Sequence, residues 1–202
     1  NEGREGIGTY AFNGPSNLTD ITIPDSVKYV GYNAFTNTGW LNKQPDGPVY
    51  AGKVLYTYKG TMPANTTFVV KDGTEVIADN ALQNQSNLVG IDIPDSVTSI
   101  GYQAFYGDSN LADITLPKNL THLGYQAFSN CQSISELTIP KSLKMLPALS
   151  SESLPNLKLK FEEGSQLEVI AYGALACLTN TVYLPAGVRY VETFGLYTTA
   201  TV

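Results

Sequence analysis

The residues that could carry out catalysis are few, and their spacing does not assemble a reactive group. The chain has 202 residues with one histidine, His122, and two cysteines, Cys131 and Cys177. A single imidazole excludes a site built on two histidines, and neither cysteine stands in the CxxC spacing of metal and redox motifs. The sequence also lacks the phosphate-loop, nucleophile-elbow and calcium-loop patterns. We therefore expect no enzyme activity, no metal site and no cofactor.

Composition narrows the classes of partner. Lys and Arg number 12 against 18 Asp and Glu, which gives a net charge of −6. Nucleic acids are bound through clustered Lys and Arg, so this balance argues against nucleic-acid binding. The sequence contains no apolar run of about 18 residues and therefore predicts no membrane insertion. Composition therefore argues against nucleic acid and membrane insertion but does not identify the ligand.

An internal repeat supplies the elements that must position any binding residue. The six-residue patterns IGTYAF, VGYNAF, IGYQAF and LGYQAF recur along the chain, and two weaker copies read IADNAL and IAYGAL. The apolar residues that begin these patterns are Ile7, Val30, Ile100, Leu123, Ile77 and Ile170. The steps from Ile77 to Ile100 and from Ile100 to Leu123 are both 23 residues, and a second motif, such as LADITLPKNL, keeps the same phase. Two motifs in fixed phase identify a repeat protein.

Each unit predicts one short strand and one return turn. The period-two segment Ile91-x-Ile93 is typical of a strand, and the proline that follows ends it. The Ala-Phe pair is expected in a short helical or 3₁₀ turn. Gly31, Gly101 and Gly124 are expected where the backbone turns tightly or adopts positive φ. A single unit cannot bury its apolar side, so the units must stack into a solenoid of about eight coils of ~23 residues.

The repeat also predicts the state of the cysteines. Cys131 and Cys177 are 46 residues apart, and hence two coils apart. Coils stack at about 4.8 Å, so roughly 10 Å separates the two residues, more than the ~7 Å that a disulfide tolerates. We expect two free thiols, buried as small apolar side chains. His122 occupies a variable position of its unit and is expected to be solvated.

The pattern IPxSVxxIGxxAF resembles the BspA-type leucine-rich repeats of bacterial surface proteins. The resemblance extends over about residues 7–193. It implies a right-handed, curved, β-rich leucine-rich-repeat solenoid of the α/β class on a secreted or surface-anchored protein. Members of this family are implicated in adhesion to host proteins and to other cells, without catalysis, and the family does not specify one partner.

Two segments depart from the repeat. Residues 36–66 contain an expected hairpin, in which Val49-Tyr50 and Val54–Tyr58 flank Ala51-Gly52. Its aromatic residues are candidate ligand contacts, although the hairpin could instead only pack on the flank of the solenoid; they are Trp40, Tyr56 and Tyr58. Near the C-terminal end, Glu162 replaces the proline that closes the strand, which we interpret as a unit of altered length.

Stacking aligns two columns of candidate binding residues. The strand column is rich in hydroxyl and acidic groups and contains Thr22, Val69, Asp92, Thr115, Thr138, Lys160 and Tyr183. The second column lies two residues after the apolar residue that begins each pattern and contains Tyr32, Tyr102, Tyr125 and Tyr172. Exposed tyrosine is favoured at binding surfaces. The alternative is that both columns are ladders that hold the coils together.

The sequence therefore predicts one solenoid over residues 1–202 with a hairpin-containing insertion at about 36–66. Neither end carries the polar cap that a solenoid needs, so we expect a piece of a longer protein. The predicted function is a non-enzymatic adhesion or ligand-binding module, extracellular or on the surface of a bacterium, that recognises host proteins, other cells or glycans. Two alternatives remain open, a structural spacer and the accessory repeat region of a larger surface enzyme.

Overall fold

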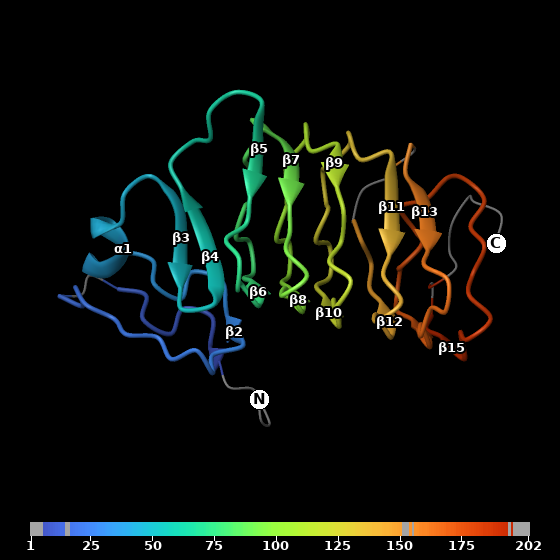
Figure 1. Ribbon diagram of the computed structural model, residues 1–202, viewed down its shortest axis with the longest axis horizontal. Helices are drawn as coiled ribbons and strands as arrows, with labels where there is room; N and C mark the ends of the chain where they lie inside the picture. The colour runs from blue at the N-terminus through green and yellow to red at the C-terminus, as the bar shows by residue number, and fades with distance from the viewer. Residues whose placement is uncertain (1–5, 15–16, 151–153, 155, 194, 196–202) are drawn as a thin grey trace.

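The computed structural model describes residues 6–14, 17–150, 154, 156–193 and 195, and it forms a β-solenoid of about eight turns (Figure 1). Its elements are β1 (Gly6–Ile7), β2 (Tyr29–Val30), α1 (Gly39–Lys43), β3 (Gly47–Ala51), β4 (Val54–Lys59), β5 (Thr66–Val69), β6 (Val76–Ile77), β7 (Leu88–Asp92), β8 (Ser99–Ile100), β9 (Asp113–Ile114), β10 (His122–Leu123), β11 (Glu136–Ile139), β12 (Met145–Leu146), β13 (Lys158–Phe161), β14 (Val169–Ile170) and β15 (Tyr190–Val191). The predicted solenoid of stacked coils is confirmed.

The strands form two rows, and both rows run along the long axis of the molecule (Figure 1). One row contains the parallel ladders β5–β7–β9 and β11–β13, at the segment that precedes the proline position. The other row contains β10–β8–β6–β4–β3 and β12–β14–β15, at the apolar residue that begins each pattern. In this second row Ile77 pairs with Ile100, and Ile100 pairs with Leu123. Residues one repeat apart therefore become neighbours, as the 23-residue step requires.

Columns of identical apolar side chains fill the space between the two rows. Phe105 and Phe128 are fully buried, and their rings stack with centroids 5.4 Å apart and planes 2° apart. Phe12 stacks on Phe35 at 5.6 Å but remains 45% exposed, whereas Phe35 is buried. Burying rings of this size against one another supplies a large share of the stability of each coil.

The return segments are successive turns rather than the expected helical or 3₁₀ turns. The third residue after the apolar residue that begins each pattern has positive φ, between 50° and 67°, in six coils: Tyr10, Asn33, Asn80, Gln103, Gln126 and Gly173. A left-handed residue cannot continue a right-handed helix, so the chain turns again at this point. The residue four positions later also has positive φ in several coils, and asparagine or glycine occupies it in Asn37, Asn84, Gly107 and Asn130.

The recurring glycines of the pattern allow neighbouring backbones to approach closely, and they do not adopt positive φ. A Cβ atom added at Gly101 would lie 2.5 Å from the backbone nitrogen of Asp79, and one at Gly124 would overlap the backbone carbon of Gly101. Neither residue is among the positive-φ glycines. The expectation of positive φ at these positions is therefore wrong, because the left-handed turn lies two residues further on.

The insertion becomes part of the solenoid wall. The expected hairpin is present as antiparallel β3 and β4, and β4 also pairs in parallel with β6 through Val54 and Val76. The short helix α1 precedes the hairpin, and the Thr38 hydroxyl caps it by accepting the backbone N–H of Leu41 at 3.1 Å. The hairpin thus occupies the place of a regular strand in the second row.

The predicted thiols are confirmed. Cys131 and Cys177 are both free and buried. Burial raises the pKa of both thiols, that of Cys177 to about 11, so both are neutral at physiological pH. His122 differs from expectation: it lies in β10, where its backbone is paired with Ser99, and it is half-buried instead of freely solvated.

Candidate ligand-binding surfaces

The strand column follows the first row, which consists of the separate ladders β5–β7–β9 and β11–β13. Val69 lies opposite Asp92 in the β5–β7 ladder, and Thr138 lies opposite Lys160 in the β11–β13 ladder. Thr22 is exposed but lies on the far side of the insertion from the others. A shallow hollow of about 230 Å³ brings together three residues of the column, Val69 on β5, Asp92 and Thr115, and its lining also includes Asp72, Ile93 and Pro94. The hollow combines two carboxylates and one hydroxyl with apolar side chains, which suits mixed polar and apolar contacts.

The tyrosine column is exposed along the second row. The exposed fractions are 37% for Tyr32, 45% for Tyr102, 41% for Tyr125 and 57% for Tyr172. Tyr102 and Tyr125 lie on neighbouring coils, because β8 and β10 pair directly. Adjacent strands are about 4.8 Å apart, so these two side chains project from backbones at that spacing.

Backbone contacts hold the exposed tyrosines in place. The N–H of Tyr102 donates to the Asp79 carboxylate at 2.8 Å, and the N–H of Tyr172 donates to Glu192 at 2.8 Å. Asp79 stands where the neighbouring coils carry tyrosine, and its second oxygen accepts the Tyr29 hydroxyl at 2.9 Å. The exposed rings therefore project from fixed backbone positions.

A ladder of side-chain amides runs beneath the tyrosines and was not anticipated from the sequence. Asn80 donates to Gln103 at 3.4 Å, and Gln103 donates to Gln126 at 3.0 Å. The signal was available, since glutamine follows tyrosine in both IGYQAF and LGYQAF. The ladder ties together the turns that carry Tyr102 and Tyr125.

The aromatic residues of the insertion pack inward. Tyr56 is 4% exposed, its ring meets Phe35 edge-on at 5.1 Å, and its hydroxyl accepts the Phe35 N–H at 3.1 Å. Burial raises the pKa of Tyr56. Trp40 tilts against Phe35 at 4.9 Å, and Tyr58 meets Phe68 edge-on at 6.0 Å. Tyr56 was expected as a candidate ligand contact, and the structure corrects this, because its side chain is buried in the core. Trp40 and Tyr58 remain half-exposed.

A polar hollow of about 210 Å³ opens where the hairpin meets the next coil. Its lining includes Tyr32, Asn33, Thr57, Asp79, Asn80 and Gln83. Amide, hydroxyl and carboxylate groups converge here beside an exposed tyrosine. The hollow thus extends the tyrosine column with hydrogen-bonding groups that the column itself lacks.

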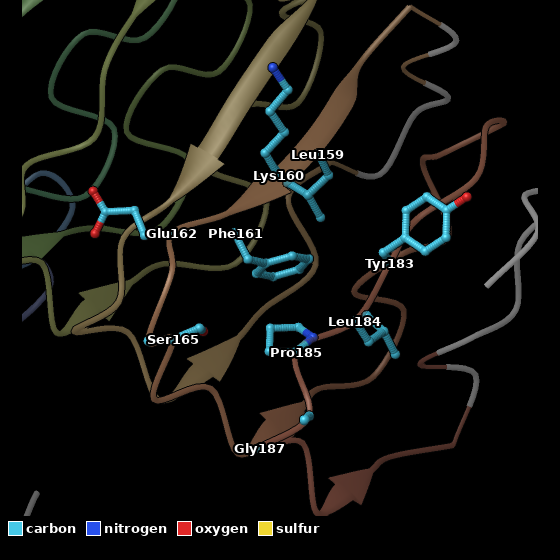
Figure 2. A pocket seen from close by; sticks show the side chains of 11 residues that line it. Leu159, Lys160, Phe161, Glu162, Ser165, Tyr183, Leu184, Pro185 and Gly187 are labelled. Atoms are coloured by element: carbon cyan, nitrogen blue, oxygen red, sulfur yellow. The ribbon is translucent and has the colours of Figure 1, made fainter.

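A larger cavity of about 600 Å³ lies near the C-terminal end, between β13 and residues 183–187 (Figure 2). Sequence reasoning missed it, although the spacing contains the signal. Phe161 and Ile170 are nine residues apart, whereas Ile93 and Ile100, at the same repeat positions, are seven apart. The longer link contributes Glu162, Gly164 and Ser165 to the cavity wall.

Within the part of the chain that the structure describes, no three His, Cys, Asp or Glu side chains gather in a metal-binding arrangement. None of the described helices has the length and apolar character needed to span a bilayer.

The comparison with protein families finds one match. The model described as "BspA type Leucine rich repeat region" matches residues 2–44 and 75–198, in six copies. The unmatched interval contains the hairpin β3–β4. No curated protein matches the sequence.

The comparison with solved structures finds bacterial leucine-rich repeat proteins. A leucine-rich repeat protein from Eubacterium ventriosum ATCC 27560 is 22% identical with a TM-score of 0.61, over 98% of this chain and 62% of its own. A leucine rich cell surface protein from Faecalibacterium prausnitzii A2-165 is 23% identical with a TM-score of 0.49, over 93% of this chain and 51% of its own. The chain thus spans less than two thirds of these proteins.

Proposed function

We propose that this chain, which belongs to the BspA-type leucine-rich repeat family, is a non-enzymatic ligand-binding module of a secreted or surface-attached bacterial protein. Its ligand is a host protein, the surface of another cell or a glycan. Family membership supports the surface location, and the stacked coils provide the extended binding surface that repeat proteins use.

The observation that carries the proposal is the pair of exposed tyrosines on neighbouring coils. Tyr102 and Tyr125 each keep more than two fifths of their surface accessible, and the amide ladder holds the turns beneath them. Tyrosine offers a large amphipathic contact area and loses little conformational entropy on binding. Preorganised rings of this kind contribute more to affinity than mobile side chains, because less freedom is lost.

The chemistry of both surfaces restricts the ligand. The net charge of −6 repels polyanions such as heparin and nucleic acid. The strand column offers Asp92 and Thr115 at its hollow, and the polar hollow beside Tyr32 offers amides and Asp79. Neutral or basic ligands with many hydrogen-bonding groups fit these surfaces best.

The test is a binding screen of the purified chain on immobilised host matrix proteins, mucins and a glycan array. We expect saturable, competable binding that falls about tenfold in the double variant Tyr102→Ser, Tyr125→Ser. The matched control is Tyr190→Ser, an exposed tyrosine (61%) outside the column.

The remaining outcomes assign the site or reject the proposal. Loss of binding in Thr115→Lys, Thr138→Lys but not in the tyrosine variant would place the site on the strand column. Absence of binding across the panel, with circular dichroism showing a folded chain, would contradict the proposal and favour a structural spacer.

A further inference from the structure

One edge of β13 pairs with no other strand among the residues that the structure describes. Its other edge is paired with β11, where the N–H of Lys158 donates to Ser135 at 2.9 Å and that of Glu162 to Ile139 at 3.0 Å. In a parallel ladder alternate residues direct their N–H and C=O groups to opposite sides. The backbone groups of Leu159 and Phe161 therefore face away from β11, and no hydrogen bond joins them to the described residues 181–187.

The free edge faces the 600 Å³ cavity, and contacts fix both margins of this cavity. At one margin the Asn180 side chain donates to the carbonyl of Leu157 at 2.6 Å. At the other margin the N–H of Arg189 donates to the carbonyl of Glu168 at 2.9 Å. The two coils are thus in contact at both margins of the cavity and separate between these margins. The space between them has the size of a ligand-binding pocket.

The cavity wall is apolar on both sides. Figure 2 shows Phe161 and Tyr183 on opposite sides of the opening, with Leu184 and Pro185 beside them. Tyr183 is 85% exposed, the highest fraction among the large exposed hydrophobic residues of the described chain. An occupant with apolar side chains would cover this surface.

One negative charge remains at the end of the cavity where β13 finishes. Lys160 is neutralised by Glu136, with 2.7 Å between the charged groups. Glu162 instead accepts the uncharged backbone N–H of Lys141 at 2.9 Å, so its charge is uncompensated by this contact. A basic group of an occupant would find a partner at this end.

We propose that the cavity binds an extended segment of a partner protein as an added β-strand, parallel to β13. The segment pairs with the N–H and C=O groups of Leu159 and Phe161, as in other cases of β-strand addition. Its sequence pattern is apolar, any residue, apolar, then Lys or Arg, because a parallel strand places its C-terminal end at Glu162. This site lies apart from the tyrosine column on which the proposed function rests, and it shares only Lys160 and Tyr183 with the strand column, so it goes beyond the function proposed above.

Selection from a displayed library of random octapeptides tests the proposal on the full chain. We expect enrichment of the stated pattern and binding of the selected synthetic peptides. Affinity should fall about tenfold in Phe161→Ser and in Tyr183→Ala, and should not change in the matched control Tyr190→Ala. Glu162→Gln should weaken only peptides that carry the basic residue.

Peptide chemistry and hydrogen exchange test the strand pairing directly. N-methylation of the peptide amides that face β13 should reduce affinity about tenfold, and methylation of the alternate amides should not. The amide hydrogens of Leu159 and Phe161 should exchange rapidly in the free protein and slowly with peptide bound, while that of Lys160, paired with β11, is slow in both.

Four results would overturn the proposal. The first is that no peptide is enriched relative to selection on the Phe161→Ser protein, and the second is equal affinity for both N-methylated peptides. The third is slow amide exchange of Leu159 and Phe161 in the free protein, which would mean that the coils close on each other. The fourth is a concentration-dependent dimer in sedimentation that Phe161→Ser abolishes, which would assign the edge to a second copy of this chain. The variant Tyr102→Ser, Tyr125→Ser should bind the selected peptides normally, so this proposal and the proposed function can fail separately.

Discussion

The same repeat builds the central coils, around Ile100 and Leu123, and the coil that follows β13. Only the central coils pack tightly against their neighbours. In the central coils a step of seven residues, as from Ile93 to Ile100, joins the two rows of strands, glycines allow close backbone approach, and Phe105 stacks on Phe128. After β13 the corresponding step, from Phe161 to Ile170, is nine residues, and a cavity opens beside it. The comparison indicates that the repeat sets which residues face one another, whereas link length decides whether neighbouring coils meet.

The largest expected effect is on the phenylalanine column. Replacing a fully buried phenylalanine by alanine removes its burial and leaves a void, which costs about 3–5 kcal/mol. We expect Phe105→Ala to lower the free energy of unfolding by this amount, measured by urea denaturation. Phe161→Ala should cost about 1 kcal/mol, because this ring already borders an open cavity. Equal losses in the two variants would show that the C-terminal coil is as tightly packed as the centre.

The glycine contacts give the next largest effect. In Gly124→Ala the new methyl group would overlap the backbone of Gly101, so the coils must separate. Overpacking of this kind costs about 1–3 kcal/mol, or a fall of roughly 3–10 °C in Tm. The control Gly8→Ala, where no atom lies within 4 Å of the added Cβ, should leave Tm nearly unchanged. A neutral Gly124→Ala would mean that close approach is not what selects glycine here.

A buried acid in the central coils should make stability depend on pH. Burial raises the pKa of Asp108 to about 9, and of its two carboxylate oxygens one accepts the Gln85 N–H at 2.7 Å while the other has no partner in the described chain. The folded state therefore holds a proton that the unfolded state, with a pKa of about 3.9, releases. Linkage then requires stability to fall as pH rises from about 4 to 9, with a slope of at most ~1.4 kcal/mol per pH unit.

Asp108→Asn should remove this slope, because asparagine keeps the shape and does not titrate. We expect the variant to gain stability relative to the parent as pH rises from about 4 to 8, and to differ little from it near pH 4. Urea denaturation at several pH values measures the difference, and Asp95→Asn, at an exposed carboxylate, is the control. An unchanged slope in Asp108→Asn would assign the pH dependence to other groups.

The smallest effect is expected at the charged pair beside the cavity. Lys160 and Glu136 are about half exposed, and exposed ion pairs contribute about 0–1 kcal/mol. Lys160→Ala should therefore change stability by less than about 0.5 kcal/mol, and high salt should remove the difference. A loss above about 2 kcal/mol would mean that this pair, and not the backbone ladder, holds β13 to β11.

Much of the fold could be predicted from the periodicity, because each repeat unit buries its apolar side chains against its neighbours in the same way. The apolar columns, the strands before the prolines and the free thiols follow from the 23-residue step, whereas the hairpin is indicated by the local strand and turn residues of the insertion. The left-handed turns could not be placed, because glutamine at 103 and 126 adopts positive φ only under the constraint of its neighbours. The inward packing of Tyr56 could not be predicted either, because it depends on how β4 pairs with β6 in the second row.

By itself the sequence determined the stacking order, and with it which side chains share a column: Tyr102 with Tyr125, Thr138 with Lys160, Phe105 with Phe128. In a repeat protein, residues one repeat apart lie side by side, so counting residues along the chain identifies the members of each column. Only the tertiary structure decided which columns are buried, that Glu162 and Phe161 border a cavity, and that β13 keeps a free edge. These features depend on the separation of neighbouring coils, and that separation is set by contacts between residues far apart in the chain, such as Asn180 with Leu157.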